Sequence, residues 1–91
     1  MSDQETGVFT SHHVLDGTPV MRVYHDEDGD WQFMPLLDVS EEDGRLVGID
    51  HLLAADPTLR ELLDLPMGWY AFRDSVDEAW SREKMPEDMW S

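Results

Sequence analysis

Alternating carboxylates after His25 form the pattern in this sequence that most resembles a metal-binding loop. Asp26, Asp28 and Asp30 occupy the first, third and fifth positions of an EF-hand calcium loop. That loop also needs glycine at its sixth position and glutamate at its twelfth, where this chain has tryptophan and leucine. We therefore predict an exposed turn, with no metal and no cofactor. A small-molecule or divalent-metal binder that uses the acidic tip Asp26–Asp30 remains the alternative function.

The histidines and carboxylates give no catalytic motif. The spacing of His12, His13, His25 and His51 matches no standard zinc site. His12 and His13 are adjacent in a segment that we expect to be a strand, so their side chains should point to opposite faces. No nucleophile beside a base and no phosphate-binding glycine loop is present in the sequence. Because 21 residues are acidic, some carboxylates will meet by chance. We expect no enzymatic activity and no catalytic residue.

Aromatic residues gather near the end of the chain, at Trp69, Tyr70, Phe72, Trp80 and Trp90. Aromatic side chains dominate small cores, so one interpretation is that they are buried. The other is that some of them form an exposed patch beside acidic residues, which would be typical of a protein-binding site. In that case we predict that Trp69, Tyr70 and Trp80 contact the partner.

The net charge of −15, from 21 acidic and 6 basic residues, limits the partners. Nucleic acid and anionic membranes are disfavoured because binding them needs basic surface. A basic protein would be attracted, although the charge also serves solubility. The chain has no cysteine, no apolar run near the ~18 residues of a membrane span, and no apolar signal-peptide segment at its start. We expect a cytoplasmic protein of undetermined oligomeric state.

Two Asp-Gly pairs predict turns between strands in the first third of the chain. Asp28-Gly29 favours a two-residue type I′ turn, which would pair Tyr24 with Phe33 and place the aromatic residues of both strands on one face. Asp16-Gly17 predicts a second hairpin that joins a strand over residues 8–15 to the next strand and puts Phe9 opposite Tyr24. Together these strands would form an antiparallel meander.

Helical spacing of leucines begins near residue 49 and predicts two short helices, at about 50–55 and 57–63. Asp56-Pro57 separates them, because aspartate is a favoured N-cap and proline a favoured first helical residue. Residues 69–73 predict a fourth strand with Trp69 and Ala71 on one face and Tyr70 on the other. The capping-box pattern from Ser75 favours a short helix, and an extended edge near Trp80 is the alternative.

The predicted fold class is α+β. An antiparallel sheet, made of the three-stranded meander and the later fourth strand, carries short helices packed on one face. Residues 1–91 form a single small domain, in which we expect 1–7 and 84–91 to be flexible tails.

Three pieces of the sequence carry a resemblance to known proteins: Asp28–Phe33, Asp56–Leu59, and Asp64–Gly68 with the aromatic segment that follows. In this order they resemble a group of small, acidic bacterial proteins of unknown function. Over about residues 20–80 the chain is also distantly similar to immunity proteins of bacterial polymorphic-toxin systems. The resemblance implies a bacterial cytoplasmic protein that binds another protein. Together with the charge of −15 and the aromatic residues near 69–80, this leads us to predict a non-enzymatic protein-binding module with a basic partner.

Overall fold

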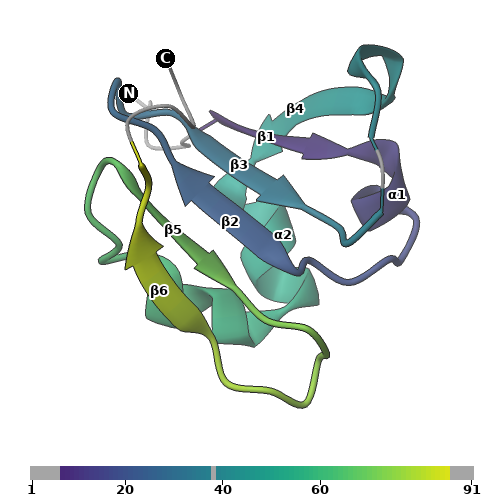
Figure 1. Ribbon diagram of the computed structural model, residues 1–91. Helices are drawn as coiled ribbons and strands as arrows, with labels where there is room; N and C mark the ends of the chain where they lie inside the picture. Colours follow the sequence, from purple (N-terminus) through teal and green to yellow (C-terminus); the bar gives the residue numbers. More distant parts are fainter. Residues whose placement is uncertain (1–6, 38, 87–91) are drawn as a thin grey trace.

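A six-stranded mixed sheet with helical segments on one face organises the computed structural model, which describes residues 7–37 and 39–86 (Figure 1). The predicted α+β class is confirmed. Strands lie in the order β4-β1-β3-β2-β5-β6. They are β1 (Gly7–Ser11), β2 (Arg22–His25), β3 (Trp31–Met34), β4 (Gly44–Gly48), β5 (Trp69–Phe72) and β6 (Ser81–Lys84). The helical segments are α1 (His12–Leu15), η1 (Glu41–Asp43), α2 (Ile49–Ala55) and η2 (Pro57–Leu62).

The hairpin of β2 and β3 is confirmed, but its register differs from the prediction by one residue. Val23 pairs with Phe33, where Tyr24 was expected. Within the turn, Gly29 N donates a hydrogen bond to Asp26 O at 2.9 Å. Gly29 is the one residue of this turn with a positive φ angle (96°). A type I′ turn needs two such residues, whereas a three-residue type I turn with a bulge needs one. The shift sends Tyr24 to the face opposite Phe33.

The predicted three-stranded meander is wrong because β1 does not pair with β2. Instead β1 lies parallel to β3, with Phe9 opposite Gln32, and antiparallel to the edge strand β4. The chain leaves β1 at Ser11 and forms the single turn of α1. Gly17 (φ 117°) ends that turn by donating to Val14 O, while Thr18 N donates to His13 O. The second Asp-Gly pair is thus a helix C-cap of the Schellman type and makes no hairpin.

The two predicted helical segments are confirmed, as α2 and the 3-10 helix η2, and both pack on one face of the sheet. Asp56 ends α2 and caps η2, accepting a hydrogen bond from Thr58 N at 3.1 Å. α2 and η2 lie behind the sheet in Figure 1. Their buried leucines belong to one core with residues of the sheet: Val8, Val20, Val23, Trp31, Phe33, Leu52, Leu53, Leu59, Leu62, Leu65 and Ala71.

The fourth predicted strand is confirmed as β5, and the segment after it forms a sixth strand where a helix was favoured. Ser75 and Glu78 close only a turn, in which Glu78 N donates to Ser75 O at 3.1 Å. The Glu78 carboxylate accepts from Asp74 N, one residue before the predicted cap. The extended alternative is therefore correct, since β6 pairs antiparallel with β5 along the edge of the sheet.

The predicted tails lie largely outside the described residues, as does Trp90. Gly7 begins β1, Lys84 ends β6, and Met85 beyond it is buried. In the described ranges, none of the helices combines the length and the apolar character that crossing a membrane requires.

Candidate functional site

α2 and η2 pack against one face of the sheet, and we call the opposite face, which neither of them covers, the open face (Figure 1). Because side chains alternate along a strand, the burial of Val8, Phe33 and Ala71 against the helices sends their neighbours to the open face. Those neighbours are mainly aromatic or aliphatic: Phe9, Leu46, Met34, Tyr24, Tyr70 and Phe72. Apolar side chains without a covering layer are typical of a surface that receives another molecule.

Aromatic rings stack across the middle of the open face. Tyr24 and Tyr70 lie opposite each other on β2 and β5, with ring centroids 5.9 Å apart, and Phe72 stacks on Tyr70 at 5.4 Å. The Arg22 guanidinium lies 5.8 Å from the Phe72 ring centroid. Burial raises the pKa of Tyr70 above its ordinary value, and the negative charge of Glu83 and its hydrogen bond to the phenol (3.4 Å) act in the same direction. These contacts fix the rings in place.

A groove of about 480 Å³ runs along the other half of the open face. Phe9 and Met34 form its apolar floor, and Ser40 and Glu41 form part of its wall. Phe9 is 44% exposed, and Leu46 on the neighbouring edge strand is 66% exposed. The groove therefore has apolar side chains at its base and an acidic residue at its side.

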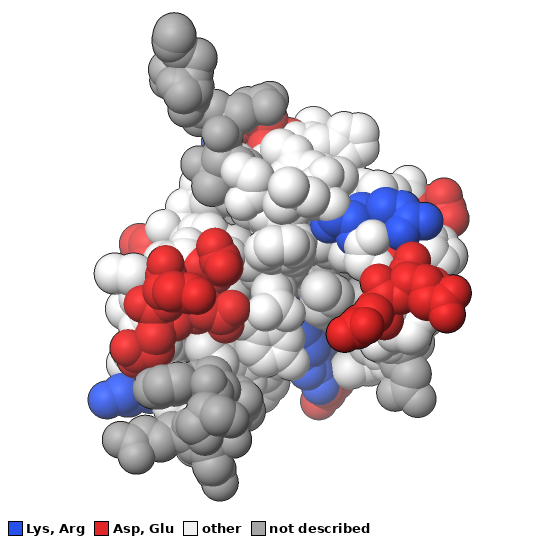
Figure 2. All heavy atoms as spheres, turned by 90° about the horizontal axis from the view of Figure 1, so that it is seen from above, with Lys and Arg blue, Asp and Glu red and all other residues white. Residues whose placement is uncertain are grey.

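Negative charge dominates the surface because the chain has 21 acidic residues and only six basic ones, and four of those six are also bonded to groups of the chain itself. Arg73 and Arg82 pair with Asp56 and Asp64. Arg22 donates to Arg73 O, and Arg45 donates to the carbonyls of residues 42 and 44. Figure 2 shows acidic side chains in separate groups with uncharged surface between them. On the side seen in Figure 2, the acidic side chains therefore do not merge into one continuous patch.

The structure does not bring Trp69, Tyr70 and Trp80 together on one face. Tyr70 lies on the open face, whereas Trp69 and Trp80 pack against the core. The Trp80 ring lies 4.2 Å from the Arg73 guanidinium carbon, and its Nε1 donates to Thr58 Oγ1. The role of these three residues in partner binding stays a prediction.

Residues of the acidic tip Asp26–Asp30 contact the turn itself. Asp26 accepts a hydrogen bond from Gln32 Nε2 at 3.1 Å, and Asp28 accepts from Asp30 N at 3.4 Å. His25 lies beneath the tip, where Nδ1 is 2.7 Å from Leu65 O and the ring stacks on Trp31. These contacts give His25 a structural role.

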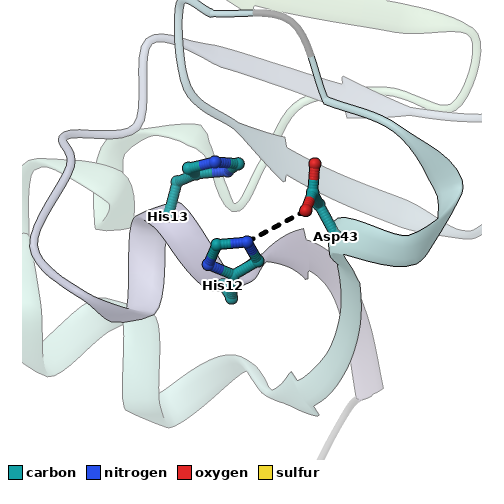
Figure 3. A group of neighbouring side chains, drawn as sticks. All are labelled: His12, His13 and Asp43. Atoms are coloured by element: carbon teal, nitrogen blue, oxygen red, sulfur yellow. Dashed lines mark hydrogen bonds and ion pairs between the residues drawn. The ribbon is translucent and has the colours of Figure 1, made fainter.

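A second group of polar side chains, which the sequence pattern did not indicate, lies where β1 passes into α1. One ring nitrogen each from His12 and His13 and one carboxylate oxygen from Asp43 all lie within 4.8 Å of one another (Figure 3). His12 Nε2 is 2.9 Å from Asp43 Oδ1, and the two histidine rings stack with centroids 4.1 Å apart. We call these three residues the histidine cluster. The expectation that His12 and His13 point to opposite faces is wrong because they lie on a helical turn and not on a strand.

The strand register explains why Asp43 joins the two histidines. β1 pairs antiparallel with β4, and Ser11 lies opposite Gly44. His12, which follows Ser11, therefore lies beside Asp43, which precedes Gly44. Both Ser40 N and Ser40 Oγ donate to Asp43 Oδ2 at 3.1 Å. The Ser40 backbone N–H lowers the pKa of Asp43, burial opposes this, and the hydrogen bond to His12 lowers it further. Asp43 Oδ1 is left facing His12.

Neither the family models nor the curated proteins compared with this chain match it, and no solved structure does.

Proposed function

We propose that this protein is a non-enzymatic binding module whose open face docks a basic partner protein. The observation that carries the proposal is the combination on one uncovered face of stacked aromatic rings, exposed aliphatic side chains and an apolar groove. Aromatic anchors with a polar border are the common composition of protein interfaces. The resemblance to immunity proteins of polymorphic-toxin systems supports a protein partner.

The negative charge of the chain favours a partner with positive charge. A net charge of −15 attracts a basic protein over distances of about a Debye length, roughly 8 Å at physiological salt. Glu83 beside Tyr70 and Glu41 beside the groove bring negative charge to the open face itself. We therefore expect rapid association at low salt and slower association when salt screens the charges.

Leu46 and Phe9 are the residues of choice for testing the open face, because both are exposed and their replacement leaves the core intact. Leu63 supplies a matched control, since it is also exposed (43%) but follows η2 on the side of the sheet that carries helices. Immobilised wild-type protein, the Phe9→Ser/Leu46→Ser variant and Leu63→Ser would each be incubated with lysate of the source organism at low and moderate salt. Any retained protein would then be purified and its dissociation constant measured by calorimetry.

The expected result is a basic protein that the wild-type chain and Leu63→Ser retain and that moderate salt releases. The open-face variant should bind it at least about tenfold more weakly, as is usual when interface anchors are removed. Equal binding by the open-face variant would show that another surface is used. A retained protein that is acidic and insensitive to salt, or no retained protein at low salt, would contradict the proposed partner.

A further inference from the structure

We propose that the histidine cluster binds a divalent transition-metal ion, of which Zn²⁺ is the representative. This inference concerns a different site from the open face and does not depend on the proposed function. It rests on the convergence of His12, His13 and Asp43, on an unpartnered buried nitrogen, and on a carboxylate placed behind one of the histidines.

The distances suit an ion with little rearrangement. Tetrahedral ligands about 2.0–2.1 Å from zinc lie about 3.3 Å from one another. His12 Nε2 and Asp43 Oδ1 are 2.9 Å apart, and the third ligand atom lies within 4.8 Å of both. An ion between them would replace the hydrogen bond of His12 to Asp43 and would draw the His13 ring inward.

Within the described part of the chain, one nitrogen of the cluster lacks a hydrogen-bond partner, and a carboxylate lies beside another nitrogen. His13 Nδ1 is buried and has no hydrogen-bond partner among the described residues, which is an unfavourable state for a polar nitrogen. His12 Nδ1 lies 3.4 Å from Asp16 Oδ2, one helical turn further on. Once an ion displaces the hydrogen bond from His12 Nε2 to Asp43, Asp16 can accept the proton that stays on Nδ1 while Nε2 binds the ion, an arrangement found behind the histidine ligands of metal sites.

The ligand types select the class of ion. Two imidazole nitrogens suit zinc, copper, nickel or iron, whereas calcium and magnesium prefer oxygen ligands throughout. His12 and Asp43 have side chains 37% and 27% exposed, so an ion can enter from solvent. Three protein ligands leave the fourth position of a tetrahedral ion for water or for a donor from another molecule.

A bound ion would also join two segments that are far apart in the sequence. It would tie η1, which contains Asp43, to the first residues of α1. Ser40 and Glu41, which lie three and two residues before Asp43 in the chain, line the groove of the open face. The site therefore lies where an ion would hold one wall of that groove.

Calorimetry with zinc chloride tests the site in the full chain. We expect the wild-type protein to bind one ion through the cluster, His12→Ala and His13→Ala to lose that ion, and Asp16→Asn to bind it roughly tenfold or more weakly. His51→Ala is the matched control, because His51 is an exposed histidine elsewhere, on α2, and its loss should change nothing. Calcium chloride should not compete for the zinc site.

Nitrogen-15 NMR of the histidine rings in the wild-type protein gives a second readout that does not depend on variants folding. Zinc should shift ring nitrogens of His12 and His13 and leave those of His51 unchanged. Zinc binding that survives both histidine substitutions, or zinc shifts at His51 alone, would overturn the proposal. So would displacement of zinc by equimolar calcium, since it would place the ion among carboxylates.

Discussion

Replacement of Asp56 by asparagine tests how much the buried ion pair with Arg73 stabilises the fold. Arg73 is 3% exposed, and its Nη2 lies 2.8 Å from Asp56 Oδ2 and 3.0 Å from Val20 O. Asp56→Asn removes the negative charge, while asparagine can still cap η2 because its side-chain oxygen can accept from Thr58 N. The variant therefore isolates the charge from the cap.

The expected cost follows from the burial of the two partners. Removing one member of a fully buried pair costs about 3–5 kcal/mol because the other charge is left without compensation. Asp56 is 25% exposed and Val20 O remains bonded to the guanidinium, so we expect about 2 kcal/mol for Asp56→Asn, below that range. Asp56→Ala also removes the cap and should cost about 1 kcal/mol more.

Asp64→Asn is the matched control for this prediction. Asp64 pairs with Arg82 at 2.9 Å, nearly the same distance, but it is 78% exposed, so its loss should cost less than about 1 kcal/mol. Urea unfolding at pH 7, followed by tryptophan fluorescence, measures both differences in the free energy of unfolding. Equal costs for Asp56→Asn and Asp64→Asn would refute the argument that burial decides the strength of the pair.

Two further predictions concern the sheet. In a Tyr24→Phe background the remaining phenol, Tyr70, should titrate above its ordinary pKa in ultraviolet absorbance, and Glu83→Gln should lower that pKa. Because the folded-state pKa is raised, the stabilisation from neutral Tyr70 is complete below about pH 10 and is lost as the pH rises through the folded-state value. A Tyr70 pKa unaffected by Glu83→Gln would contradict the assigned cause. Phe33→Ala should lower the free energy of unfolding in urea by about 3–5 kcal/mol because Phe33 is fully buried. Phe9→Ala, on the open face, should lower it by less than about 1 kcal/mol. Similar costs for the two variants would mean that the open face is covered.

Elements encoded by short-range signals could be predicted from the sequence. The β2–β3 hairpin, the division of two helices at Asp56-Pro57 and the alternation of Trp69, Tyr70 and Ala71 depend on residues only a few positions apart. Turn propensity, capping and side-chain periodicity act over that range. The one-residue error at Asp28-Gly29 has the same origin, because the pair is compatible with two turns that require different numbers of positive φ angles.

The sequence by itself determined the acidic charge, the α+β class, the paired helices and the alternation of side chains along β5. Only the tertiary structure decided that β1 lies between β3 and β4, and therefore that Tyr24 and Tyr70 stack on an open face and that His12 meets Asp43. The pairing of strands that are far apart in the sequence depends on how all strands pack around one core, and a local sequence pattern does not predict it. The physical reason is that a contact across 31 residues, such as that between His12 and Asp43, is fixed by the register of a strand pair and not by either residue's neighbours in the chain.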